Sequence, residues 1–171
     1  TERRDAREVA ERIEDAGGSF SEFSGNNSFG LGVEVLKDDF PVALRTLEEA
    51  LLEPAFREDT FAVERDSQVA EIRENLDDIV GYGRYQLRRA YFGAFPYAYN
   101  RLGSIDHLEA LTVDGIRELH RRLLVGSNLV VAVSGDLDRD AVIDGLSPVL
   151  RRMPAGQPEP AADTRFDAPS A

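Results

Sequence analysis

The feature that most constrains the fold is a turn sequence between two stretches of alternating polarity. Gly25-Asn26-Asn27 separates residues 19–24 from residues 28–36, and Gly and Asn readily adopt the backbone angles that tight turns require. In the second stretch the apolar side chains at positions 29, 31, 33 and 35 point to one face of a strand. The sequence therefore predicts an antiparallel hairpin with one buried face.

Apolar residues that recur with the helical period predict helices on both sides of this hairpin. They are expected at residues 3–16, 40–53, 58–75, 78–92, 112–124 and 136–150. The nearly all-apolar residues 128–134 predict a third strand that is buried on both faces. The expected fold class is α+β, a mainly antiparallel sheet with helices packed on one face. Three strands are few for such a sheet, so the domain is expected to be truncated at its N-terminus, with further strands before Thr1.

The length of 171 residues fits one domain. Residues 1–153 are expected to form it. Residues 154–171, which are rich in Pro and Ala, are expected to be a linker or tail. Targeting information would lie upstream of Thr1, which leaves the compartment of a bacterial protein open between periplasm and cytoplasm.

The chain is acidic, with 32 Asp and Glu against 20 Lys and Arg and a formal net charge of −12. This charge disfavours nucleic acid as a partner, and no stretch reaches the roughly 18 apolar residues of a membrane span. Lys37 is the only lysine, and strong acidity with almost no lysine is typical of a salt-adapted or a high-GC organism. The absence of cysteine excludes disulfides and thiol catalysis. The arginines of the predicted helix at 78–92 are expected to pair with carboxylates of this chain.

Histidine is scarce, and this limits metal chemistry. His107 and His120 each lie two residues from a glutamate, a spacing that points the two side chains to different faces of a helix. Neither belongs to a His-x-x-x-His or His-x-x-Glu-His pattern. Both are expected to be structural, so the chain lacks the usual ligands of a zinc site.

Two carboxylates on the predicted helix at 58–75 are the best candidates for chemistry. Glu64, Gln68 and Glu71 stand at i, i+4 and i+7 and so share one face. Glu64 and Glu71, one heptad apart, offer a hard-oxygen ligand and a second acid. The simpler interpretation is a solvated charged face, since Glu occurs on nearly every predicted helix.

Seven segments, taken in order, resemble the pitrilysin/insulinase family of zinc metallopeptidases, the inverzincins. Together they span most of residues 1–153, and their order and spacing are more specific than any one of them. The segments are REVAERIEDAGG at 7–18, VLKDDFPVAL at 35–44, ERDSQVAEIRE at 64–74, YFGAFPY at 91–97, LGSID at 102–106, LTVD at 111–114 and NLVVAVSG at 128–135.

The resemblance implies a two-layer metallopeptidase domain whose zinc site combines an H-x-x-E-H helix with a glutamate from a later helix. It implies Glu71 as the third zinc ligand and Glu64 as a supporting acid. The H-x-x-E-H helix would precede Thr1, so no residue of this chain supplies the two imidazoles or the general base. Zinc is expected in a catalytic parent protein. This chain alone is expected to bind no zinc tightly and to be inactive.

The resemblance also implies that a peptide substrate binds by strand addition along the strand that follows Gly17-Gly18. Ser21, Glu22 and Phe23 are the candidate residues of this substrate strand. Active family members carry Asn-Ala where this chain has Ser21 and Glu22, and this departure favours a non-catalytic half. Expected partners are a peptide and other domains of the parent chain or a homologous subunit.

Three interpretations follow. The chain is a domain of a zinc metallopeptidase whose metal motif lies upstream or in a partner half. Alternatively, it is a non-catalytic scaffold of the same family that encloses the peptide chamber. The third interpretation is an acidic interaction domain without chemistry. An H-x-x-E-H motif before Thr1 would separate the first two, and the backbone fold separates both from the third.

Overall fold

The computed structural model describes residues 1–158, which fall into two compact units. The first unit contains residues 1–23, 29–56 and 117–158, and the second contains residues 24–28 and 57–116. Most of the predicted linker or tail, residues 159–171, lies outside the described residues. No helix in the described range combines the length and apolarity needed to cross a bilayer.

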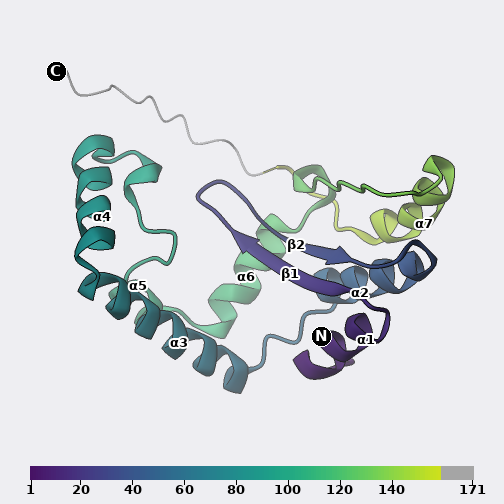
Figure 1. Cartoon of the computed structure of the whole chain (residues 1–171), viewed down its shortest axis with the longest axis horizontal. Helices are drawn as coiled ribbons and strands as arrows, with labels where there is room; N and C mark the ends of the chain where they lie inside the picture. Colours follow the sequence, from purple (N-terminus) through teal and green to yellow (C-terminus); the bar gives the residue numbers. More distant parts are fainter. Residues whose placement is uncertain (159–171) are drawn as a thin grey trace. The chain divides into compact units, whose positions relative to one another are not determined.

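The first unit is organised around α2 (Phe40–Leu52). Besides the turn that leads into it, α2 contacts α1 (Ala6–Asp15), strand β2 (Phe29–Glu34) and α7 (Arg139–Arg152). Strand β1 (Ser19–Ser24) pairs with β2 as an antiparallel hairpin that lies beside α2 (Figure 1). A short 3₁₀ turn, η1 (Lys37–Asp39), leads into α2. The predicted hairpin and its α+β class are thus confirmed.

Local sequence explains where these elements begin and end. Asp5 and Glu8 form a capping box at the start of α1, each side chain accepting from the backbone N–H of the other. Gly17 follows that helix with φ 64°, a conformation that favours glycine. Pro41 lies in the first turn of α2, where its missing N–H removes no hydrogen bond.

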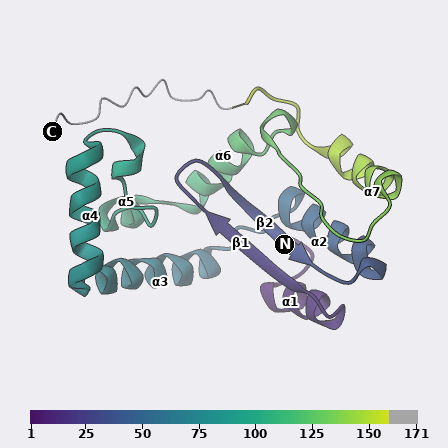
Figure 2. The ribbon, with the colours of Figure 1, turned by 45° about the horizontal axis from the view of Figure 1, so that its top comes forward.

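The second unit is helical. It contains α3 (Glu58–Asp77), α4 (Ile79–Phe92), the 3₁₀ turn η2 (Pro96–Ala98), α5 (Ile105–Ala110) and the start of α6 (Val113–Leu123). Asp78 ends α3 and caps α4 by accepting from the N–H groups of Val80 and Gly81. The two helices leave Asp78 in clearly different directions (Figures 1 and 2).

A small apolar core joins α3 to α5. Val69 and Ile72 of α3 pack against Leu108 of α5, and Leu102 and Ile105 lie against this cluster. The helix α5 was not predicted from the sequence, because a helix of 6 residues carries little periodic signal. The sequence nevertheless contains an N-cap signal for this helix, Ser104, whose side chain accepts from the His107 N–H.

The prediction of a third strand at residues 128–134 is wrong. Gly126–Asn128 forms a 3₁₀ turn, and residues 129–134 belong to no strand. The backbone of Leu129 is extended, but the only sheet among residues 1–158 is β1–β2. A strand requires a neighbour that completes its hydrogen-bond ladder. Without one, the valines predicted to be buried are exposed, Val130 by 91%.

The burial predicted for the hairpin is also incomplete. Phe29 is exposed, and Leu31 and Val33 are only partly buried. The two strands have helix α2 against them but no third strand beside them among the described residues. A sheet of two strands leaves much of its apolar face uncovered.

Glu49, near the C-terminal end of α2, pairs with two arginines from the N-terminal part of the chain. Arg4 donates a hydrogen bond to it, and the Arg12 guanidinium lies 3.8 Å away. Burial of the Glu49 side chain acts to raise its pKa. The hydrogen bond from Arg4 and the charges of Arg4 and Arg12 outweigh that effect and hold the pKa below its ordinary value.

Two further carboxylates of this region bind arginines from both ends of the unit. Glu53 lies 2.7 Å from Arg3 and 3.1 Å from Arg152, and Arg152 also reaches Glu48 at 2.6 Å. Arg152 donates hydrogen bonds to Glu53 and Glu48, and these bonds raise the pKa of Arg152. The planar guanidinium can bridge two carboxylates in this way because it presents several donors in a fixed fork. The arginines therefore tie the N-terminal segment and α7 to α2.

Glu49→Gln is expected to lower the free energy of unfolding at pH 7 by about 2 kcal/mol, because it removes a charge-assisted hydrogen bond from a largely buried position. A carboxyl whose folded-state pKa is depressed stabilises the fold above its unfolded-state pKa of about 4.3. That contribution is lost as the pH falls through the folded-state value. Urea unfolding at pH 7 and pH 3.5 should show the difference from the wild type shrinking in acid.

Glu11→Gln is the matched control. Glu11 pairs with Arg7 on the exposed side of α1, so its loss should change stability by at most about 0.5 kcal/mol. Equal effects of Glu49→Gln and Glu11→Gln would contradict the special role given to Glu49.

Candidate functional site

The two candidate carboxylates lie on α3 in the second unit. Glu64 and Glu71 are both exposed, and one heptad of helix separates them by roughly 10 Å. Between them Gln68 donates from Nε2 to the Leu102 carbonyl oxygen at 2.7 Å. The three side chains share one helix face, as their spacing predicted. On that face Gln68 makes a structural hydrogen bond to Leu102. The partial burial that suits a metal-ligating carboxylate is missing at Glu71.

The residues present do not fit a zinc site. Among residues 1–158, no group of three or more His, Asp or Glu side chains could hold a metal ion. Protein zinc sites use three or four such ligands in a tetrahedral arrangement. Glu71 belongs to no such group, so no catalytic step through a metal follows from this chain.

Both histidines have structural partners. In the second unit, His107 Nδ1 lies 2.6 Å from the Ser104 hydroxyl at the start of α5. In the first unit, His120 Nε2 lies 2.8 Å from the Leu51 carbonyl oxygen, and its ring meets the Phe56 ring edge-on at 5.2 Å. These contacts agree with the structural role predicted for them.

The candidate substrate residues lie on β1 in the first unit. Ser21, Glu22 and Phe23 are all exposed. In the described part of the chain β1 pairs with β2 alone, which leaves the backbone groups of its other edge available. An edge of this kind is the acceptor that peptide strand addition requires.

Two glycines of β2, Gly30 and Gly32, which were not predicted to matter, determine how the β1 side chains are arranged. A Cβ at Gly30 would lie 2.6 Å from the Phe23 ring, and one at Gly32 would lie 2.7 Å from the Ser21 hydroxyl oxygen. Ser21 and Phe23 therefore share one face of the hairpin and fold over these glycines, whereas Glu22 points to the opposite face. Two glycines spaced by two within a predicted strand were the available signal.

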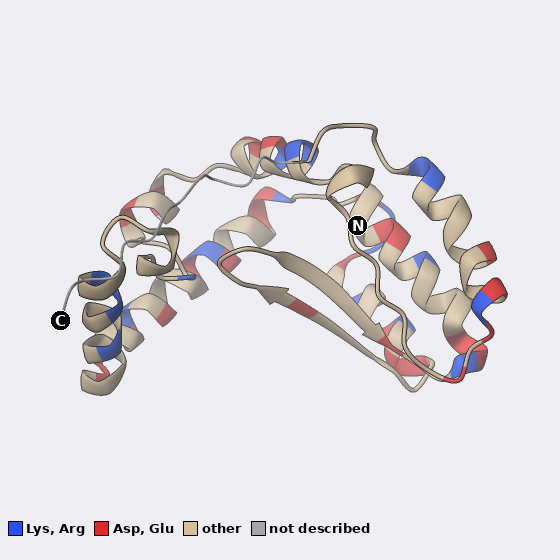
Figure 3. Ribbon diagram, turned by 90° about the horizontal axis from the view of Figure 1, so that it is seen from above, with Lys and Arg blue, Asp and Glu red and all other residues tan. Residues whose placement is uncertain are grey.

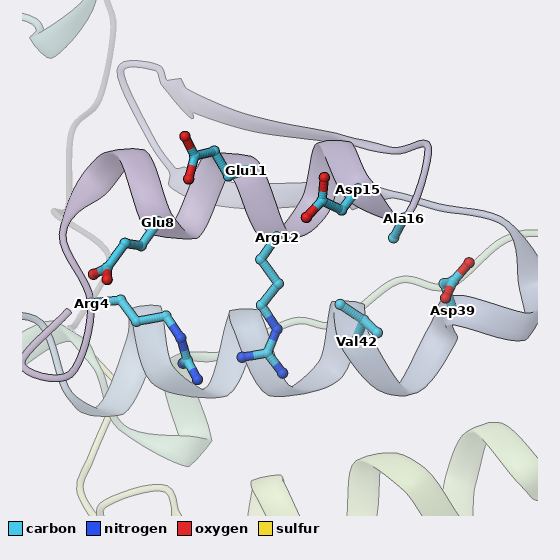
Figure 4. Close-up of a pocket in the computed structure, with 8 residues that line it drawn as sticks. All are labelled: Arg4, Glu8, Glu11, Arg12, Asp15, Ala16, Asp39 and Val42. Atoms are coloured by element: carbon cyan, nitrogen blue, oxygen red, sulfur yellow. The ribbon is translucent and has the colours of Figure 1, made fainter.

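The cleft between α1 and α2, of about 540 Å³, is lined mainly by charged side chains (Figure 4). Its lining residues are Arg4, Glu8, Glu11, Arg12, Asp15, Ala16, Asp39 and Val42. Arg4 and Arg12 extend toward α2, where both already contact Glu49. The sequence did not indicate this cleft, and its two arginines serve the ion pairs that hold α1 on α2.

The start of α3 carries a carboxyl whose pKa is strongly lowered, Asp59. The Arg57 side chain and the Thr60 N–H donate hydrogen bonds to Asp59 and lower its pKa to about 2. A carboxylate in the first helical turn also suits the positive end of the helix dipole. Asp59 thus stays ionised and stabilises the helix that carries Glu64 and Glu71.

Comparison with known proteins places this geometry in a family. An uncharacterised zinc protease of Streptomyces coelicolor is 27% identical over 163 residues, which cover 92% of this chain and 36% of that protein. A non-peptidase homologue from Helicobacter pylori is 23% identical over 125 residues, which cover 73% of this chain and 29% of that protein. The chain thus spans about a third of the length of these relatives.

Solved structures support the same fold. The inactive domain of an M16 peptidase from Pseudomonas fluorescens matches with a TM-score of 0.83 at 19% identity, over 98% of this chain and 40% of that one. The family model described as insulinase, peptidase family M16, matches residues 1–96, more than half of the chain. The chain therefore belongs to the insulinase family of peptidases, family M16.

Proposed function

We propose that this chain is a non-catalytic domain of a zinc metallopeptidase and helps to enclose the peptide that its parent protein binds. The observation that carries the proposal is the pair Ser21 and Glu22, which stand on β1 where the resemblance gives active family members Asn-Ala, and which are both exposed. Glu71, which the resemblance makes the third zinc ligand, is exposed and belongs to no group of three metal-ligating side chains among residues 1–158. In this proposal Glu71 is part of a solvated helix face.

The names of similar proteins support the proposal. Several curated relatives are described as zinc proteases, the Helicobacter pylori relative as a non-peptidase homologue, and the Pseudomonas fluorescens domain as inactive. In this proposal residues 1–153 form one domain of the inverzincin type from a salt-adapted bacterium, with zinc bound elsewhere in the parent protein. Its partners are a peptide and further domains of the parent chain or a homologous subunit.

The catalytic-half interpretation is the second candidate. Glu64 and Glu71 on one face of α3 favour it, since their spacing matches the family's supporting acid and third ligand. It requires an H-x-x-E-H helix supplied from outside these 171 residues. In that case Glu71 binds zinc and Glu64 supports it.

The peptide is proposed to bind along the open edge of β1. Strand addition uses the backbone groups of that edge and takes its specificity from alternate side chains. Ser21 and Phe23 lie on the hairpin face that carries Gly30 and Gly32, and Glu22 lies on the other. Glu22 then sets a preference for basic residues in the added strand, because opposite charges on neighbouring strands attract.

The chain alone is predicted to bind no zinc with sub-micromolar affinity and to cleave no peptide, since at most one ligand of the required set is present. Isothermal titration with zinc chloride and a protease assay on an unfolded protein test this. One-to-one binding below 1 μM, or turnover that a chelator stops, would contradict the prediction.

Glu71→Gln in the full-length parent protein is predicted to leave both zinc content and peptidase rate unchanged, because the scaffold proposal gives Glu71 no ligand role. Glu64→Gln serves as the matched variant on the same face. Loss of zinc and of activity with Glu71→Gln, in a protein that remains folded, would establish the catalytic half instead.

Glu22→Gln is predicted to weaken the binding of an Arg- or Lys-rich extended peptide by about twofold to fivefold, as expected for one exposed charge pair. A peptide of the same length with Gln in place of its basic residues should be unaffected. Fluorescence anisotropy at 50 mM salt measures both affinities. Glu34→Gln on β2 is the control, and equal losses in the two variants would rule out the β1 edge.

A further inference from the structure

Helix α4 in the second unit exposes an apolar face. Ile79, Val80 and Leu87 are 87%, 60% and 69% exposed, and Tyr91 is also exposed. At roughly 100° per residue these four side chains share one side of the helix, and Gly83 lies between them. We name these five residues, Ile79, Val80, Gly83, Leu87 and Tyr91, the α4 apolar face. No residue of α4 is buried.

One side of α4 is held against the segment around η2, although no residue of the helix is buried. Arg88 donates two hydrogen bonds to the Tyr97 carbonyl oxygen, at 2.8 and 3.2 Å. The Phe92 ring meets those of Phe95 and Tyr97 at 6.1 and 5.8 Å. These contacts hold the segment around η2 against one side of α4, leaving the α4 apolar face uncovered.

Gly83 is the least expected residue of this face. Glycine in a helix interior is less favourable than alanine. A glycine there is therefore expected where the surroundings leave no room for a side chain. Gly81 is such a position, because a Cβ there would lie 2.6 Å from Asp78 Oδ2. At Gly83 a Cβ would meet nothing within 4 Å, and its φ is not in the left-handed region. A missing side chain in the middle of an apolar face allows the backbone of a second helix to approach closely.

The charge of α4 opposes that of the whole chain. The helix carries Arg84, Arg88 and Arg89 and no acidic residue, within a chain of net charge −12. Figure 3 shows the blue of Lys and Arg along this helix. Among residues 1–158 no carboxylate forms the predicted pair with these arginines: Arg88 binds a backbone carbonyl and Arg89 lies over the Tyr85 ring at 5.7 Å. Arg84 is exposed beside Val80 and Leu87, so it flanks the α4 apolar face with a positive charge.

We propose that the α4 apolar face docks an acidic amphipathic helix supplied from outside this chain. Val80 and Leu87 bury against its apolar stripe, Gly83 forms the notch where the two helix backbones approach, and Arg84 pairs with its carboxylates. An apolar stripe with flanking charges is the usual form of helix-in-groove recognition. The positive charge of α4 selects an acidic helix over a basic one.

The test uses the full 171-residue chain and two synthetic helical peptides of three heptads. Both carry Leu at the a and d positions; one has Glu at e and g, and the other has Lys there. Fluorescence anisotropy should show binding of the Glu peptide and at least tenfold weaker binding of the Lys peptide. Leu87→Asp should weaken the binding of the Glu peptide at least tenfold. Ile143→Asp on α7 is the control, because Ile143 lies in the first unit and is about as exposed as Tyr91. This variant should leave the affinity for the Glu peptide unchanged.

Gly83→Ala separates a docking notch from an incidental glycine. The added methyl should raise the thermal midpoint of the chain, because alanine is the better helix former. It should also weaken the binding of the Glu peptide at least fivefold, because it fills the notch. A higher midpoint with unchanged affinity would overturn the role of Gly83, and equal binding of the two peptides would overturn the charge selection.

Two further outcomes would assign the face to another occupant and overturn the proposal. Sedimentation that shows a dimer of the wild type and a monomer of Leu87→Asp would assign the α4 apolar face to a second copy of the chain. Binding to phosphatidylserine vesicles that Leu87→Asp abolishes, without binding of the Glu peptide, would assign it to a membrane surface.

Discussion

The cluster of arginines around Glu48, Glu49 and Glu53 is the interaction on which the first unit depends. The helices it joins bury little on their own, since α1 has only Ile13 fully buried and α7 has no buried residue. Apolar contact alone would leave the directions of these helices poorly determined. Breaking the mostly buried Arg4–Glu49 pair is costly because it leaves one charge without a partner, so this pair favours the observed placement of the N-terminal segment on α2, whereas the half-exposed Arg152 of α7 adds less.

Close backbone approach complements these ion pairs. A Cβ at Gly145 of α7 would lie 2.8 Å from Leu44 of α2, so the glycine lets α7 lie directly on that helix. Arg152 then reaches two carboxylates of the α2 region from the end of α7. A lysine could not bridge both with fixed geometry. The near absence of lysine in this chain is therefore consistent with how its helices are held together, whatever its origin in composition.

The elements that the sequence predicted are those whose signals are local. The hairpin follows from a turn and alternation within 18 residues, and the shared face of Glu64 and Glu71 follows from helical period alone. The strand at 128–134 failed because its existence depends on a neighbour distant in sequence, which an apolar run does not supply. The exposure of Glu71 and the packing of Phe23 over Gly30 were equally out of reach, because both depend on which surfaces meet. Gln68 shows the same limit: its spacing suggested a charged face, and its contact with Leu102 makes that face partly structural.

Charge in this protein is segregated on a scale that total composition does not show. Helix α3 carries seven acidic residues and two arginines, whereas α4, directly after Asp78, carries three arginines and no acid. Electrostatic fields in physiological salt decay over about 8 Å, and α4 is about 21 Å long. A partner in contact with the C-terminal half of α4 therefore meets the positive charge of its three arginines, whereas the first turn of the helix adjoins Asp77 and Asp78. The net charge of a chain can therefore exclude a class of partner only for the chain as a whole. Which partner an exposed helix binds depends on the charges of that helix and its neighbours.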